Sequence, residues 1–243
     1  MNAQLSRVVL APGYLLHRRE YRDSSLILEL FSREHGRLTA FARGARGPKG
    51  RFGTLQAFQP LLLSWQGRGE AAHLTGAESA ARPGALPSGA LMSAFYLNEL
   101  LLKLTHPHDP HPEIHDGYGQ ALQELRAGID AENALRRFEL RLLGWLGYGM
   151  SLAEEARSGE PVLAARHYQV EFAAGVERCA PDAPGATAGR VLLCLAQERP
   201  LQGAEDQKAA RLLMRRALDH CLEGRELKTR SVARALQRRE WAR

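Results

Sequence analysis

The first third of the chain alternates short apolar runs with glycine-rich or charged turns, a rhythm typical of β-strands. The strand-like runs cover residues 8–10, 14–17, 26–31, 37–42, 58–65 and 71–77. Pro12 and Gly13 separate the first two runs and indicate a bend or bulge within one strand. The pattern therefore predicts five short strands, which is the size of a small closed β-barrel.

Beyond a cluster of breakers at residues 82–87, the apolar positions change to a helical period. They predict helices over residues 89–105, 113–127, 131–147, 186–197, 206–222 and 228–239. An insert at about residues 150–183 follows neither period and is expected to be irregular. The predicted fold class is α+β, with an N-terminal OB-fold β-barrel over residues 1–80 and a C-terminal α-helical domain over residues 81–243.

The charge of the chain is concentrated at its two ends. Residues 1–51 hold 10 Lys and Arg against 4 Asp and Glu, and residues 208–243 hold 11 against 4. The segment between them is acidic, with 12 cationic and 19 anionic side chains. Basic ends favour a polyanionic partner that is held by two regions, although ordinary solvated surface charge would give the same counts.

Several classes of protein are disfavoured by what the sequence lacks. No apolar run approaches the roughly 18 residues that span a bilayer, and no signal-peptide pattern is present, so we expect no membrane partner and a cytoplasmic protein. The cysteines Cys179, Cys194 and Cys221 form no CxxC pair. No Walker A loop, dinucleotide fingerprint or nucleophile elbow occurs, so we expect no metal, no cofactor and no enzymatic activity.

Residues 42–51, with the sequence ARGARGPKGR, place cationic side chains between glycines in a loop that joins two predicted strands. Such a loop exposes backbone amides and positive charge, which suit the phosphates of a nucleic acid; a solvated loop is the alternative. Phe52 follows the loop and could stack on bases, as could Phe41 or Trp65. The expected DNA-binding residues are Arg37, Arg43, Arg46, Lys49, Arg51, Phe52, Arg68, Lys228 and Arg230.

Residues 106–115 contain four histidines and two carboxylates. Their spacing matches no zinc pattern, and we interpret the segment as a connection between helices. A metal-dependent hydrolase is an alternative, in which His106, His108 and His111 would be the first candidate ligands.

Segments along the whole chain resemble RecO, a bacterial family of recombination mediators. They are residues 21–31 (YRDSSLILELF), 34–37 (EHGR), 42–46 (ARGAR), 59–63 (QPLLL), 67–70 (GRGE), 96–100 (YLNEL), 135–140 (LRRFEL), 143–149 (LGWLGYG) and 227–230 (LKTR). The segments follow the family's order, and together they are specific although each alone is weak.

The resemblance implies an OB-fold followed by a helical domain, binding to single- and double-stranded DNA, and annealing of complementary strands. It also implies partnership with RecR and with the acidic, Phe-terminated tail of single-strand-binding protein, in order to load RecA, and a nucleoid-associated location. Many family members carry a four-cysteine zinc finger after the LGY segment. This sequence has only Cys179 between residues 149 and 184, so we expect the branch without zinc.

The family match assigns Arg136 as the cation for the tail of single-strand-binding protein and Leu146 as part of an apolar pocket. Helix patterning adds Leu142 and Trp145 as neighbours. Plain core packing is the alternative role for Leu142 and Leu146. The alternative function is an RNA-binding OB protein of translation or RNA processing, because a basic loop on a barrel is compatible with either nucleic acid.

Overall fold

The computed structural model describes residues 7–45, 52, 55–67, 72–81, 84–128, 130–172 and 174–241, with side chains as far as residue 236. The chain divides into two compact units, one of residues 1–126 with 227–243 and one of residues 127–226. These units do not coincide with the predicted boundary at residue 80, because three helices pack in the same unit as the barrel.

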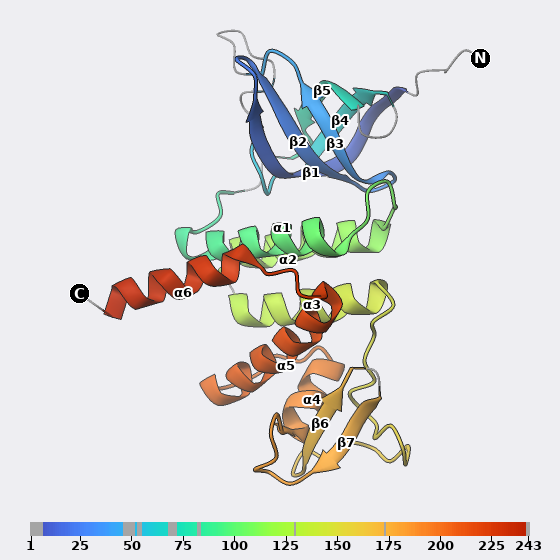
Figure 1. The fold of residues 1–243 in the computed structure, drawn as a ribbon, viewed down its shortest axis with the longest axis vertical. Helices are drawn as coiled ribbons and strands as arrows, with labels where there is room; N and C mark the ends of the chain where they lie inside the picture. Colours follow the sequence, from blue (N-terminus) through green and yellow to red (C-terminus); the bar gives the residue numbers. More distant parts are fainter. Residues whose placement is uncertain are drawn as a thin grey trace. The chain divides into compact units, whose positions relative to one another are not determined.

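The first unit contains a closed five-stranded barrel (Figure 1). Its strands are β1 (Arg7–Tyr21), β2 (Ser25–Ser32), β3 (Gly36–Ala42), β4 (Leu61–Gln66) and β5 (Ala72–Ser79). β1 pairs with both β2 and β4, and a parallel pairing of β3 with β5 closes the ring. This arrangement confirms the predicted OB-type barrel.

The long strand β1 continues through the Pro12-Gly13 pair, at which the sequence predicted a bend or bulge within one strand. Its register with β4 shifts between Val8 and Ala11, so a bulge just before this pair bends the strand while pairing continues. A Cβ on Gly13 would lie 2.7 Å from Leu63 Cδ1 and 2.9 Å from the Phe31 carbonyl oxygen. Glycine is therefore required here because neighbouring strands approach too closely for a side chain.

Three helices complete the first unit: α1 (Leu91–Leu104), α2 (Pro112–Ala127) and α6 (Lys228–Trp241), with a short 3₁₀ turn at Ser88–Ala90 before α1. A buried polar chain joins α1 and α2 to the barrel. The Tyr118 hydroxyl donates to Asn98 Oδ1 at 2.6 Å, and Asn98 Nδ2 donates to the Leu16 carbonyl of β1 at 2.7 Å. Asn98 is only 2% exposed, so these bonds form away from water.

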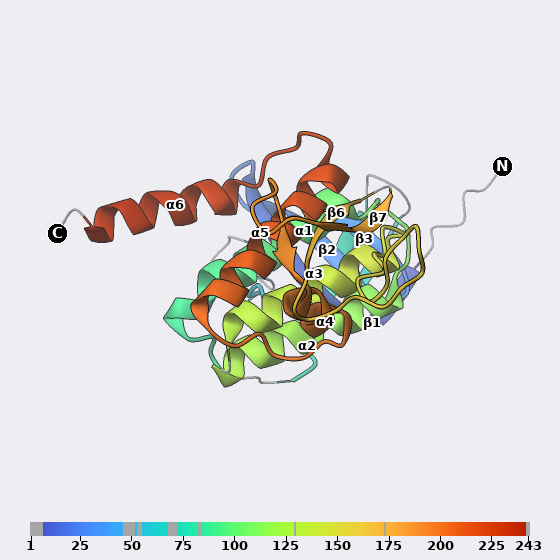
Figure 2. The same cartoon turned by 90° about the horizontal axis from the view of Figure 1, so that it is seen from below.

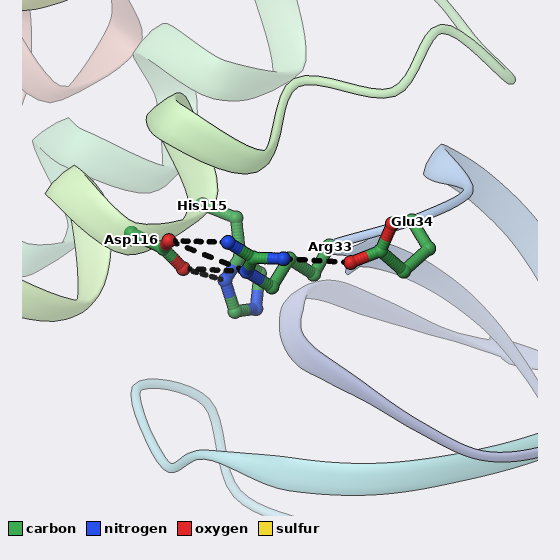
Figure 3. A network of polar contacts seen from close by, with 4 residues as sticks. All are labelled: Arg33, Glu34, His115 and Asp116. Atoms are coloured by element: carbon green, nitrogen blue, oxygen red, sulfur yellow. Dashed lines mark hydrogen bonds and ion pairs between the residues drawn. The ribbon is translucent and has the colours of Figure 1, made fainter.

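A second contact between barrel and helices centres on Arg33, in the turn after β2 (Figure 3). Its guanidinium binds the Asp116 carboxylate of α2, at 3.0 Å from Nε and 2.8 Å from Nη2, and also reaches Glu34 at 2.7 Å. This hydrogen bonding with Arg33 lowers the pKa of Asp116 to about 2. The adjacent His115 is buried against Tyr14, and burial lowers its pKa.

Helix α6 is fastened to α1 at its first turn. Glu99 Oε1 accepts from the Lys228 amide at 2.8 Å, and Glu99 Oε2 accepts from the Thr229 amide at 2.8 Å and from its hydroxyl at 2.7 Å. A carboxylate at a helix N-terminus satisfies amides that have no partner within the helix. Beyond this turn, α6 extends away from α1 and α2 (Figures 1 and 2).

The second unit contains α3 (Ala131–Trp145), α4 (Gly189–Ala196), α5 (Ala204–Leu222) and a three-stranded sheet in the order β7-β6-β8. The strands are β6 (His167–Glu171), β7 (Gly175–Cys179) and β8 (Thr187–Ala188). The expectation of an irregular segment at 150–183 was wrong for β6 and β7. Each of these strands buries only one or two apolar side chains, which is too short a signal for a clear period.

We expect Asn98→Ala to lower the free energy of unfolding by about 2–4 kcal/mol, because it leaves the Tyr118 hydroxyl and the Leu16 carbonyl without these bonds. Urea-induced unfolding measures the change. Gln120→Ala, on the exposed face of α2, is the control and should change stability by less than about 0.5 kcal/mol. Equal effects of the two substitutions would contradict a structural role for Asn98.

We expect Glu99→Gln to cost about 0.5–2 kcal/mol at neutral pH, the range for loss of a helix cap. Burial opposes ionisation of Glu99, but its bonds from Thr229 and Lys228 prevail and hold its pKa below the ordinary 4.5. A lowered folded-state pKa stabilises above the unfolded pKa, and this contribution is lost as the pH falls below it. The difference between wild type and Glu99→Gln should therefore shrink toward about pH 3. The control is Glu78→Gln, an exposed position, which should change stability at neutral pH by less than about 0.5 kcal/mol.

Candidate nucleic-acid interface

One hollow of about 460 Å³ opens on the barrel, and we call it the barrel hollow. Its lining residues come from the β1–β2 turn, the end of β3 and β5; they are Tyr21, Arg22, Ser24, Ser25, Phe41, Arg43, Gly44 and His73. Strand pairing brings these segments together, since Tyr21 pairs with Ser25 and Phe41 pairs with His73 across the parallel β3–β5 contact. Closure of the barrel therefore creates the hollow from three distant parts of the sequence.

Three aromatic rings line the barrel hollow. The Phe41 ring lies 5.5 Å from the Tyr21 ring at 62° and 5.9 Å from the His73 ring at 46°, measured between centroids. The three side chains are half-buried, unlike the rings of the barrel core. Because the rings are inclined to one another rather than stacked, they leave apolar surface for a flat ligand.

Two arginines supply the charge of the barrel hollow. The Arg22 guanidinium carbon lies 5.2 Å from the centroid of the Tyr21 ring, a cation–π contact, and Arg22 and Arg43 are both exposed. No Asp or Glu is among the described residues that line the hollow. Asp23 lies in the same turn as Arg22 but is not among the described residues that line the hollow. Aromatic surface beside positive charge is the combination that binds a base together with its phosphate.

Two residues expected to contact DNA have other roles. The Arg37 side chain is 16% exposed and binds Glu29 Oε2 at 3.3 Å and the Thr105 carbonyl at 3.2 Å, so it joins β3 to the end of α1. Phe52 is 5% exposed and belongs to the barrel core, as does Trp65 at 4%. We therefore withdraw Arg37 as a phosphate contact and Phe52 and Trp65 as stacking residues.

Of the remaining residues that were expected to bind DNA, the structure describes only some. Arg43 lies at the barrel hollow, and Phe41, an expected stacking candidate, lies beside it. Lys228 is exposed and Arg230 half-buried at the start of α6, so they stay predictions. The other four cations that were expected to bind DNA lie outside the described residues and also stay predictions; they are Arg46, Lys49, Arg51 and Arg68.

Sequence reasoning missed Tyr21, Arg22 and His73. Tyr21 and Arg22 end the first strand just before a polar turn, Asp23-Ser24-Ser25, which is a recognisable hairpin signal. His73 carries no such signal, because its position depends on the parallel pairing with β3. The sequence alone could therefore have indicated Tyr21 and Arg22 as candidates, but not His73.

The four residues expected to bind the tail of single-strand-binding protein all belong to α3 or its C-terminal end, but they differ in burial. Arg136 is 6% exposed, and its Nη2 binds Glu139 at 2.7 Å. Leu142 is fully buried, and Trp145 and Leu146 are half-buried at the end of the helix.

Only Arg136 of these four lines a shallow hollow on this unit, which we call the α3 hollow. Its apolar residues include Leu140, Leu195 and Leu201, and its cations include Arg137 and the exposed Arg199. The Glu198 carboxylate also lines it, and its volume is only about 10 Å³. The α3 hollow thus combines leucines with positive charge within one unit.

The histidine-rich segment connects α1 to α2 over residues 105–111, and α2 includes its last four residues. His111 lies 3.1 Å from Asp109 and 3.4 Å from Glu113. The His108 amide donates to the Arg37 carbonyl at 2.8 Å, and Gly36 lies so close to Asp109 that a Cβ would clash with its backbone. Among the described residues, no three His, Cys, Asp or Glu side chains are placed to hold a metal ion.

In the part of the chain that the structure describes, no helix combines the length and apolar character that crossing a membrane requires.

Comparison with known proteins assigns both parts of the chain. Residues 7–82 match the family model for the N-terminal part of recombination protein O, and residues 89–231 match the model for its C-terminal part. The DNA repair protein RecO of Methylococcus capsulatus is 48% identical over 231 residues, which cover 95% of each chain.

Two further relatives agree with this assignment. The DNA repair protein RecO of Alkalilimnicola ehrlichii is 48% identical over 237 residues, 96% of this chain and 93% of the relative. That of Halorhodospira halophila is 43% identical over 230 residues, 93% of this chain and 97% of the relative. Two family models in the expected order and relatives of nearly full length leave one assignment: the chain belongs to the RecO family of DNA repair proteins.

Proposed function

We propose that this protein is a recombination mediator that binds single- and double-stranded DNA through the barrel unit. In this proposal it anneals complementary strands coated with single-strand-binding protein and acts with RecR to load RecA. The observation that supports it most directly is the barrel hollow, where Arg22 and Arg43 flank aromatic rings on an OB-type barrel. Phosphate contacts of this kind bind without reading sequence.

Annealing of this kind requires no catalytic residue. Two DNA strands repel each other, and a basic surface that neutralises their phosphates raises the rate at which they meet. Base pairing then supplies the free energy of the product. The predicted basic loop at residues 42–51 includes Arg43, which lines the barrel hollow, and we propose that its other cations also bind phosphates.

We further propose that the acidic tail of single-strand-binding protein docks on α3. An acidic peptide that ends in Phe requires a cation for its carboxylates and an apolar site for its ring. The α3 hollow contains Arg137 and Arg199 beside leucines, with the Glu198 carboxylate among them. At about 10 Å³ it is too small to enclose the Phe ring, which would pack on its surface. Arg136 would act there mainly by holding its neighbours in place, because its guanidinium is already buried against Glu139.

Replacing Arg22 and Arg43 together with Ala should weaken binding to both single- and double-stranded DNA. The slope of log K against log salt concentration should become shallower by roughly 0.7 for each single-strand phosphate contact removed. Fluorescence anisotropy over a salt series measures both effects. The control Arg157→Ala removes one charge from the other unit and should change neither; an unchanged slope in the double variant would contradict the proposed interface.

The protein should accelerate annealing of two labelled complementary strands precoated with the cognate single-strand-binding protein, without nucleotide or metal. Strand-pairing fluorescence follows the reaction. Tight binding to bare strands without acceleration would show a DNA-binding protein that lacks the mediator step.

Arg137→Glu should lower affinity for the acidic tail peptide by roughly tenfold or more, since it puts a like charge beside the peptide carboxylates. Titration of the labelled peptide measures the affinity. We avoid Arg136→Glu, because a carboxylate buried beside Glu139 would unfold the unit. Arg157→Glu is the charge-matched control. Retained affinity in Arg137→Glu, with loss in Leu146→Ala, would move the docking site to the C-terminal end of α3.

A further inference from the structure

The barrel hollow contains more than a phosphate site requires. Phosphate binding needs only cations, and Arg22 and Arg43 supply them. The hollow also holds three rings that the barrel leaves half-buried, although the same barrel buries Trp65 and Phe52 to 4–5% exposure. Aromatic surface left exposed beside cations indicates a ligand that has a flat apolar part as well as a charge.

We propose that the barrel hollow is a subsite for one unpaired nucleotide of a single strand, with its base packed against Phe41 and its phosphates on Arg22 and Arg43. The inference rests on the proposed DNA-binding function and adds to it the group that distinguishes a single strand from a duplex. Tyr21 and His73 form the two sides of the subsite, since their rings flank that of Phe41.

The dimensions and chemistry of the hollow suit this occupant. Its volume of about 460 Å³ lies within the roughly 300–1,000 Å³ of small-ligand clefts. The inclination of the Phe41 ring to both neighbours, at 62° and 46°, shows that neither ring stacks on it face to face. Ser24 and Ser25 also line the hollow, and their hydroxyls are suited to bind a sugar or phosphate oxygen.

The subsite would select single strands for a physical reason. A base within a duplex is stacked on both faces and paired along its edge, so it can enter a protein hollow only after unstacking and unpairing. An unpaired base needs much less free energy to enter the hollow, because no base pair has to be broken. Duplex DNA would then contact only the arginines and the basic loop, whereas a single strand would add the contact with Phe41.

The test is a pair of binding measurements with a spectroscopic readout. A single strand carrying 2-aminopurine and a blunt duplex of the same length are titrated with wild type and with Phe41→Leu. Leucine keeps an apolar side chain at this position of β3, opposite Ile27 of β2, so the barrel should be retained. Thermal unfolding checks that it is.

In Phe41→Leu we expect single-strand affinity to fall by roughly 5- to 150-fold, the range for loss of one stacked base, while duplex affinity stays the same. The 2-aminopurine fluorescence change seen with wild type should be lost. Tyr148→Leu, which removes a 48% exposed ring from the other unit, is the control and should behave as wild type. Equal ratios of single-strand to duplex affinity in wild type and Phe41→Leu would overturn the subsite.

A measurement on wild type alone keeps the test decisive if Phe41→Leu does not fold. A single strand with abasic residues in place of its bases should bind more weakly than the intact strand, and equal binding would overturn the proposal. Binding of a free deoxynucleoside monophosphate as tight as that of the strand would overturn it in favour of a free-nucleotide site.

The results also separate this inference from the proposed function on which it depends. Absence of DNA binding by wild type would contradict the function itself. Binding that is weakened by the Arg22 and Arg43 substitutions but insensitive to Phe41→Leu would leave the DNA-binding function intact and remove only the base subsite.

Discussion

The first unit depends on one buried amide. Asn98 of α1 accepts from Tyr118 of α2 and donates to the Leu16 carbonyl of β1, so a single side chain joins two helices and the barrel. The Leu16 carbonyl is a backbone group of a strand, and burying it without a donor would be costly. The amide therefore fixes where the helices lie against the strand that runs through the whole barrel.

Several segments that carry the resemblance to RecO hold elements of the fold together through hydrogen bonds, rather than forming a surface for a partner. The YLNEL segment supplies Asn98 to the barrel and Glu99 to α6, and the LKTR segment supplies the amides that Glu99 binds. The EHGR segment supplies Arg37, which binds the Thr105 carbonyl at the end of α1. Side chains in these segments hold elements together, which explains why distant short motifs occur as a set.

Periodicity predicted the barrel strands and the helices because each signal lies within one element. Periodicity does not predict which residues of different elements contact each other. Arg37 was expected to contact phosphate, but in the structure it binds Glu29 and the Thr105 carbonyl. Phe52 was expected to stack on bases because it follows a basic loop, but its side chain is buried in the barrel core. The barrel hollow was only half predictable, since Phe41 and Arg43 are neighbours in sequence and His73 reaches them through nonlocal strand pairing.

The chain leaves the first unit after α2, builds the second unit, and returns as α6. The amide of Lys228 binds a carboxylate 129 residues earlier in the chain. During synthesis, the barrel with α1 and α2 therefore emerges with its Glu99 carboxylate still unoccupied, and the second unit must be made before the cap can form. Because this contact spans 129 residues of sequence, the first unit is finished only after the second has been translated.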